Sequence, residues 1–108
     1  MLNKEDFFKI DIRVGTIIDA SINKKTRIPA YKLKIDFGEL GIKNSSAQIT
    51  DLYTPDTLIG RQVICVFNLT PVKISEVKSE VLVLGTITDK GVVLLNVDEK
   101  VENGLRIS

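Results

Sequence analysis

Apolar and polar residues alternate along two early segments of the chain, and this two-residue period is typical of half-buried β-strands. The first segment, residues 10–22, changes phase at Gly15, where a glycine favours a bulge or a sharp bend in one long strand. The second segment, residues 31–37, keeps its phase throughout and directs Lys32 and Lys34 to the polar face. Both segments therefore predict strands with one wet face and one buried face.

The rest of the pattern predicts further strands, a hairpin and two short helices. We expect strands at residues 42–50, Val63–Phe67 and Val81–Leu84, a hairpin at residues 85–97, and helices at Lys4–Phe8 and from Pro55. About five strands with one helix after the third is the order of the OB-fold, a partly open five-stranded barrel. We therefore predict an all-β OB-fold with short flanking helices. A two-sheet sandwich is the alternative, but the pattern lacks its seven evenly spaced strands.

The connection between the strands Val63–Phe67 and Val81–Leu84 is longer than the few residues that usually join two strands. Connections of this length tend to be functional or to contain a short strand of their own. Its polar and turn-forming residues are Asn68, Pro71, Lys73, Lys78, Ser79 and Glu80. We predict that this connection and the lysine-bearing strand at residues 31–37 form the functional surface.

The composition is that of an ordinary globular domain. Of the 108 residues, 44% are hydrophobic and 27% are charged, and the length suits one domain over residues 1–108 with a core of its own. No apolar run approaches the roughly 20 residues of a membrane helix, and the amino terminus lacks the apolar core of a signal peptide. We therefore expect a cytoplasmic protein without membrane insertion.

Charge and residue types limit the chemistry that the chain can perform. The net charge of +1 argues against a strongly cationic nucleic-acid binder but allows a local basic face. Asp11 and Arg13 fall on one strand face and are expected to pair with each other. There is no histidine, and the single Cys65 lies in an apolar strand, where a buried structural thiol is expected. No acid is spaced to serve a nucleophile and no glycine-rich phosphate loop is present, so we expect no enzyme activity, cofactor or metal.

Five ordered strings carry a resemblance to a known family. They are DIRVGTI (Asp11–Ile17), KLKIDFG (Lys32–Gly38), SSAQIT (Ser45–Thr50), NLTPVKI (Asn68–Ile74) and KSEVLVLG (Lys78–Gly85). The chain resembles the tRNA-binding domain family, which includes the carboxyl-terminal extension of methionyl-tRNA synthetases. SSAQIT and KSEVLVLG are similar to the CsaA-like group of secretion chaperones. The resemblance implies an OB-fold, a homodimer that binds tRNA and, for the CsaA-like group, association with preproteins and the export machinery.

The same resemblance assigns candidate residues. The family motifs Asn-Leu-x-Pro-x-Lys and Lys-Ser-Glu and the family's strand-three serine fall on Asn68, Leu69, Pro71, Lys73, Lys78, Ser79, Glu80 and Ser46. The family's glycine shortly before Lys-Ser-Glu is replaced here by Glu76, an acid that would repel phosphate. The resemblance therefore implies an RNA-binding surface that includes Ser46, Asn68, Lys73, Lys78, Ser79 and Glu80.

RNA binding of this kind needs cations and hydrogen-bond donors rather than catalytic groups. The predicted phosphate contacts are Lys32, Lys43, Lys73 and Lys78, and the predicted donors to phosphate or to 2′-hydroxyl groups are Ser46, Asn68 and Ser79. Few aromatic residues are available for base stacking, because Tyr31 and Phe37 are predicted to face inward. We therefore expect recognition of tRNA or other folded RNA by backbone and shape.

A chaperone that binds unfolded preproteins or peptides is the alternative function. It requires an exposed apolar groove or a free strand edge. The candidate residues, which the barrel would leave partly exposed, are Phe7, Phe8, Val72, Ile74 and Val77. Burial in the core or in a dimer interface is the other interpretation of these residues.

Overall fold

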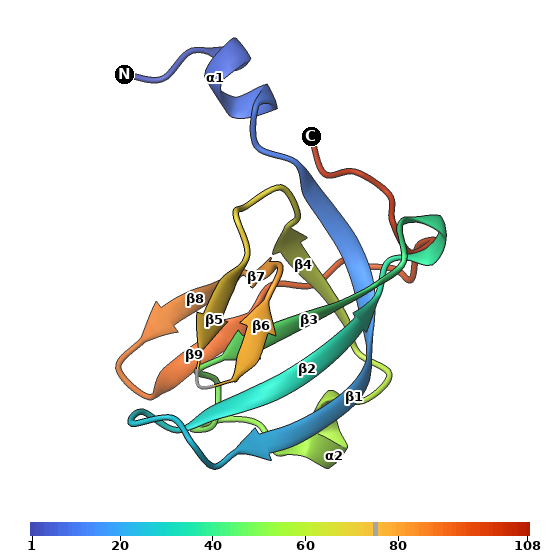
Figure 1. The fold of residues 1–108 in the computed structure, drawn as a ribbon. Coiled ribbons are helices and arrows are strands. Elements are labelled where there is room, and N and C mark those ends of the chain that lie inside the picture. Colours follow the sequence, from blue (N-terminus) through green and yellow to red (C-terminus); the bar gives the residue numbers. More distant parts are fainter. Residues whose placement is uncertain (75) are drawn as a thin grey trace.

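A computed structural model describes residues 1–74 and 76–108. One antiparallel sheet curls into a half-open barrel with the strand order β3-β2-β1-β4-β7 (Figure 1). Its strands are β1 (Ile12–Asn23), β2 (Ala30–Asp36), β3 (Ile42–Ala47), β4 (Gln62–Val66) and β7 (Leu82–Val83). The helix α2 (Pro55–Leu58) follows the third strand, so the predicted all-β OB-fold is confirmed.

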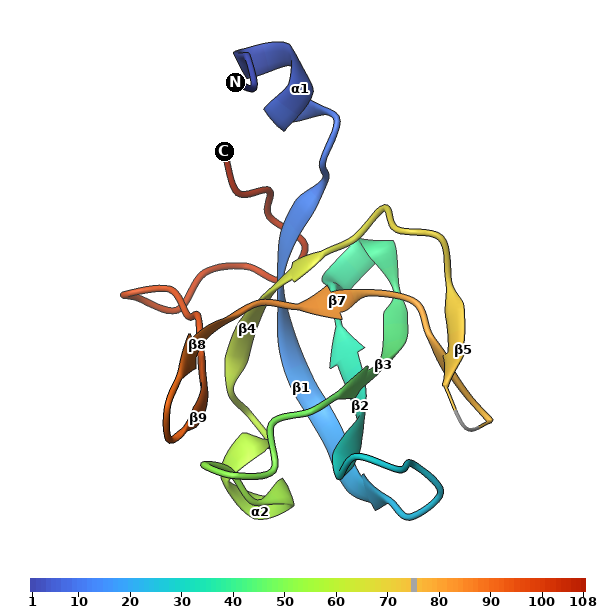
Figure 2. The same cartoon turned by 90° about the vertical axis from the view of Figure 1, so that its left-hand side faces the viewer.

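Two hairpins and two further helical segments complete the described chain. They are β5 (Val72–Ile74) with β6 (Val77–Ser79), β8 (Gly85–Thr88) with β9 (Gly91–Leu94), α1 (Lys4–Phe8) and the 3-10 helix η1 (Gly38–Leu40). The long connection after β4 therefore contains short strands of its own, and the hairpin at residues 85–97 is confirmed. The α1 helix stands away from the barrel in both views (Figures 1 and 2).

The alternation of β2 places one face in the core and leaves the other face wet. Leu33, Ile35 and Phe37 are almost completely buried, whereas Lys32 and Lys34, which alternate with them, are exposed. Burial of one such apolar side chain contributes about 1.5–3 kcal/mol to the stability of the fold. This burial fixes the orientation of β2, because a slip of one residue would move the lysines into the core.

The bulge predicted at Gly15 is present but lies further along the strand. The register of β1 against β2 shifts between Ile17 and Asp19. Gly15 has a different role, because a Cβ atom at this position would lie 2.6 Å from Ile35 Cγ2 and 2.8 Å from Phe37 Cε1. The glycine is therefore required where the strand passes close to core side chains, and the prediction of a bulge at this position was wrong.

The carboxyl-terminal tail runs beside the start of β1, an arrangement that no local pattern predicted. The N–H of Val14 donates to the carbonyl of Leu105 at 3.0 Å, and the N–H of Gly104 donates to the carbonyl of Val14 at 2.7 Å. The N–H of Ile107 donates to the carbonyl of Ile12 at 2.8 Å. The tail thus satisfies main-chain groups of β1 on the side where β2 has not yet begun.

Cys65 on β4 is fully buried, which confirms the predicted structural thiol. Burial removes the thiolate from water and raises the pKa of Cys65 to about 12. The thiol is therefore protonated and shielded at neutral pH.

Candidate nucleic-acid interface

The outer face of β2 and β3 carries the candidate interface. Lys32 and Lys34 of β2 pair directly with Ser46 and Asn44 of β3, so these four side chains share the wet face of the sheet. Lys78 of β6 reaches the same area from the β5–β6 hairpin. Lys32, Lys34, Asn44 and Lys78 border a surface hollow of about 400 Å³. The structure therefore brings Lys32 and Lys78 to one hollow, whereas Ser46, the cross-strand partner of Lys32, borders a different hollow.

Two acids border the same hollow and reduce its positive charge. They are Asp19 of β1 and Glu76 in the turn between β5 and β6. The Glu76 carboxylate is already paired, because its Oε2 lies 2.7 Å from Nζ of Lys25. The lining of the hollow holds three lysines and two acids, so its formal charge is +1.

The β5–β6 hairpin carries two lysines directly opposite each other. Lys73 of β5 is the cross-strand partner of Lys78 of β6, and both side chains are exposed. Like charges at directly opposite positions of an antiparallel pair are destabilising. An anion placed between them would relieve this repulsion, so the pair suits an anionic ligand.

Lys43 does not join the other lysines. It lies on β3 opposite Ile35, on the same face of the strand as the buried Ser45, whereas Ser46 points to the other face. Its Nζ lies 5.7 Å from the centroid of the Phe67 ring, a cation–π distance. A phosphate contact by Lys43 would therefore belong to a surface separate from the lysine hollow.

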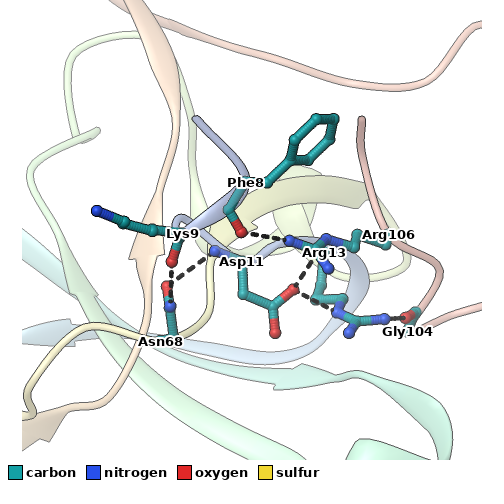
Figure 3. Close-up of polar contacts among 7 residues, drawn as sticks. All are labelled: Phe8, Lys9, Asp11, Arg13, Asn68, Gly104 and Arg106. Carbon is teal, nitrogen blue, oxygen red and sulfur yellow. Dashed lines mark hydrogen bonds and ion pairs between the residues drawn. The ribbon is translucent and has the colours of Figure 1, made fainter. Parts of the chain in front are cut away.

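Asn68 joins the linker after α1 to the loop after β4 (Figure 3). Its Oδ1 accepts from the N–H of Asp11 at 2.9 Å, and its Nδ2 donates to the carbonyl of Lys9 at 2.8 Å. Arg106 of the tail contacts the adjoining end of α1, because its Nη2 donates to the carbonyl of Phe8 at 2.9 Å. Asn68 therefore holds the linker in place, a structural role in addition to the RNA contact predicted for it.

Asp11 is the acidic centre of this cluster. Its Oδ1 lies 2.7 Å from Nε of Arg13, which confirms the predicted pair, and 3.8 Å from Nε of Arg106. The Nη1 of Arg13 also donates to the carbonyl of Gly104 at 3.0 Å. The cluster ties β1 to the tail (Figure 3). Sequence patterns missed Arg106, because residues so far apart in the chain share no local signal.

Ser79 and Glu80 are half-buried, and neither borders the hollow. Their side chains accept hydrogen bonds from the main chain of β3, at Ser46 and Asn44 respectively. The structure therefore places them next to the lysine surface and not on it.

The five candidate residues for peptide binding separate into two groups. Val72, Ile74 and Val77 lie on the hairpin face opposite to its lysines, and Ile74 borders a second hollow of about 590 Å³. The lining of that hollow is mostly apolar and includes Ile28, Ala30, Ala47, Ile49, Leu82, Val83 and Val92. Phe7 and Phe8 instead lie on α1, with ring centroids 5.6 Å apart and exposed fractions of 38% and 51%.

In residues 1–74 and 76–108, no three residues among His, Cys, Asp and Glu are grouped so that they could hold a metal ion. No helix in this part of the chain is long and apolar enough to span a membrane.

Comparison with known proteins identifies the family. The chain matches the family described as "Putative tRNA binding domain" over residues 12–106. The chain belongs to the tRNA-binding domain family. This tRNA-binding domain is 52% identical to the CsaA chaperone protein from Picrophilus torridus, with a TM-score of 0.95 and coverage of 100% of both chains. It is 50% identical to chaperone CsaA from Bacillus anthracis, with a TM-score of 0.95 and coverage of 100% of this chain and 99% of the other.

The tRNA-binding domain is also similar to one part of larger enzymes. It is 35% identical over 103 residues to the methionine–tRNA ligase of Methanococcoides burtonii. This alignment covers 95% of the present chain but 15% of the ligase. The similarity therefore concerns a domain of that enzyme.

Glu76 occupies a backbone conformation that glycine favours. Its φ angle is 72°, and no other non-glycine residue of the described chain has a positive φ. The resemblance to the tRNA-binding domain family places a glycine here, and glycine adopts the left-handed region without steric cost. The substitution thus changes both the charge of the hollow and the strain of the hairpin turn.

Proposed function

We propose that this tRNA-binding domain acts as a CsaA-like cytoplasmic homodimer that binds tRNA or other folded RNA by backbone and shape, without catalysis. The observation that carries the proposal is the gathering of Lys32, Lys34 and Lys78 around one hollow, with Lys73 directly opposite Lys78. Phosphate contacts supply most of the affinity in sequence-independent binding. Two lysines of strand β2 and two of the β5–β6 hairpin offer such contacts.

Recognition by shape follows from the lack of a stacking platform on this face. Tyr31 and Phe37 are buried, with exposed fractions of 6% and 0%. Proteins that bind unstructured single strands stack successive bases on exposed aromatic rings. The outer face of β2 and β3 has lysines and short polar side chains in these places, which suits phosphates and 2′-hydroxyl groups of folded RNA.

The homodimer is supported by α1. This helix has five residues and buries none of them, while Phe7 and Phe8 are exposed. Isolated helices of that length are unstable in water, and two adjacent exposed aromatic residues favour contact with a second chain. A dimer would also double the number of lysines that one RNA molecule meets. Replacing Phe7 and Phe8 with serine should yield a monomer in analytical ultracentrifugation.

The RNA proposal is tested by fluorescence anisotropy with a folded tRNA across a salt series. Four phosphate contacts predict a slope near −3 in a plot of log affinity against log salt, or roughly a fiftyfold loss between 50 and 200 mM salt. A mixed-sequence unstructured RNA of equal length should bind more weakly. Absence of binding at low salt would contradict the proposal.

A matched pair of variants locates the surface. Replacing Lys73 and Lys78 with alanine should reduce the slope by about 1.4, since each contact contributes about 0.7. Replacing Lys90 and Lys100 with alanine removes the same charge from exposed positions outside the hollow and should leave the slope nearly unchanged. Equal effects of the two pairs would show that only net charge matters.

A second candidate function, chaperoning of unfolded preproteins for the export machinery, is favoured by the hollow of about 590 Å³ next to the hairpin. Its mostly apolar lining and exposed Ile28, Ile74 and Leu82 suit an extended apolar peptide. Replacing Ile74 with aspartate should weaken binding of a reduced, unfolded test protein while tRNA binding is retained. Unchanged binding of the unfolded protein would argue against this groove.

A further inference from the structure

The Lys-Ser-Glu motif (Lys78–Glu80) lies where the barrel closes. We call the contact between residues 79–81 and residues 44–46 of β3 the seam. β3 is an edge strand of the sheet, so the main-chain groups on its outer side need partners other than a neighbouring strand. The residues after β6 run along this edge, and the N–H of Glu80 donates to the carbonyl of Asn44 at 2.8 Å. This is one main-chain bond of the seam.

Side chains complete the seam. The Oε1 of Glu80 accepts from the N–H of Asn44 at 3.1 Å and from Nδ2 of the same residue at 3.4 Å. Ser46 lies two residues after Asn44 on β3, and its N–H donates to the Oγ of Ser79 at 3.2 Å. Two main-chain donors of the edge strand are thus satisfied by side-chain oxygens where a paired strand would offer carbonyls.

Val81 anchors the other side of the seam. It is buried, and its carbonyl accepts from the Oγ of Ser45 at 2.9 Å and from the Oγ of Ser79 at 3.4 Å. The hydroxyl of Ser79 therefore accepts from β3 and donates to the chain that leaves the hairpin. This geometry fixes the path of residues 79–81 against β3.

The seam sets the position of the hairpin lysines. Lys78 directly precedes Ser79 in β6, and Lys73 pairs with Lys78 across the hairpin. Every residue of β5 is exposed, so β5 contributes little burial to hold the hairpin in place. The hydrogen bonds at Ser79 and Glu80 therefore connect the hairpin to β3.

We infer that Ser79 and Glu80 are positioning residues, which close the barrel onto β3 and thereby hold Lys73 and Lys78 beside Lys32. This role explains why an acid follows two lysines of a phosphate-binding surface, where its charge alone would repel RNA. The effect on RNA rests on the proposed function, whereas closure of the seam does not.

Amide hydrogen exchange of the RNA-free protein tests the seam. Glu80→Ala should speed the exchange of the Asn44 amide about tenfold or more, and Ser79→Ala should do the same at Ser46, because each loses the acceptor of its hydrogen bond. Glu80→Gln keeps Oε1 and should preserve the protection of Asn44. Unchanged exchange at Asn44 in Glu80→Ala would overturn the inference, and Ser79→Ala keeps the test available if Glu80→Ala does not fold.

A double-mutant cycle tests the link to RNA. Glu80→Ala should weaken tRNA binding and flatten the salt slope, and Glu80→Gln should restore most of both. In a protein that already lacks Lys73 and Lys78, Glu80→Ala should cause little further loss. An equal loss in both backgrounds would show that Glu80 contacts RNA directly and would overturn the positioning role. If wild-type protein binds no tRNA, the proposed function fails while the exchange result still decides the seam.

Discussion

Nζ of Lys25 lies 2.7 Å from Oε2 of Glu76 and joins the loop after β1 to the turn of the β5–β6 hairpin. The exposed fractions of the two side chains are 65% and 69%, so the pair contributes at most about 1 kcal/mol to stability. The φ angle of 72° at Glu76 costs a non-glycine residue about 1–2 kcal/mol. The backbone strain at this turn is therefore at least as large as the stabilisation by the ion pair.

Glu76→Gly should tighten tRNA binding several-fold and leave stability nearly unchanged. The variant removes an acid from the edge of the lysine hollow, which strengthens attraction to phosphate. Relief of about 1–2 kcal/mol of backbone strain is opposed by loss of the ion pair and by the greater entropy of unfolded glycine, which cost up to about 1 kcal/mol each. Anisotropy titration and urea unfolding measure the two effects.

Glu76→Asp is the control for this variant, because aspartate keeps the charge. It should bind tRNA as the wild-type protein does. Tighter binding by Glu76→Asp would show that the backbone conformation, and not the acid, limits affinity.

Gly15→Ala should lower the free energy of unfolding by about 1–3 kcal/mol, the usual cost of overpacking a core. The new Cβ atom would collide with Ile35 and Phe37. Gly41→Ala serves as the comparison, because its Cβ would meet nothing within 4 Å and only its φ angle of 93° carries a cost. Urea unfolding of both variants separates the two effects. A change below about 0.5 kcal/mol for Gly15→Ala would contradict the close approach.

Cys65 should react with a thiol reagent at pH 8 only in the unfolded protein, since the folded thiol is buried and its pKa is raised to about 12. The pKa of Cys65 in the folded protein exceeds the unfolded value of 9.0. The contribution of the thiol to the free energy of unfolding is therefore fully present below pH 9 and declines as the pH rises toward 12. The slope from this one group approaches about 1.4 kcal/mol per pH unit. In Cys65→Ala, the free energy of unfolding should lack this decline above pH 9. An identical pH profile in both proteins would contradict the raised pKa of Cys65.

Asn68→Ala should weaken the proposed dimer without unfolding the barrel. The variant removes two hydrogen bonds, to Asp11 and Lys9, that hold the linker between α1 and β1. Each such bond contributes about 0.5–1.5 kcal/mol, so the dissociation constant should rise roughly tenfold. Sedimentation equilibrium measures the change. Asn96→Ala, at an exposed asparagine elsewhere, should have no effect, and an equal shift in both variants would refute the role of Asn68.

Local patterns predicted much of the fold. The alternation in residues 31–37 identified the buried face of β2 and the exposed Lys32 and Lys34. The capping residue Asn3 accepts from the N–H of Asp6 at the start of α1, as its sequence position favours. These features depend on neighbours a few residues apart, so the sequence alone contains the required information.

Candidate site residues were predicted less completely, because a shared motif does not place its members on one surface. Lys43 and Ser46 lie on the same short strand, yet they point to opposite faces. The register of β3 against β2 and the closure of the barrel decide which of the two side chains shares the outer face with Lys32. Neither can be read from β3 by itself, since a shift of one residue would exchange the faces.

By itself, the sequence determined the succession of the main strands and helices along the chain, the buried cysteine, the exposed lysine face of β2 and the family of the chain. Only the tertiary structure decided that Asn68 holds the α1 linker, that Ser79 and Glu80 bond to the edge of β3, and that the tail pairs with β1. Strand alternation arises from local geometry and burial, which leave a periodic trace in the chain. Hydrogen bonds between residues that are distant in the chain produce no local sequence pattern, because their partners come together only when the barrel closes.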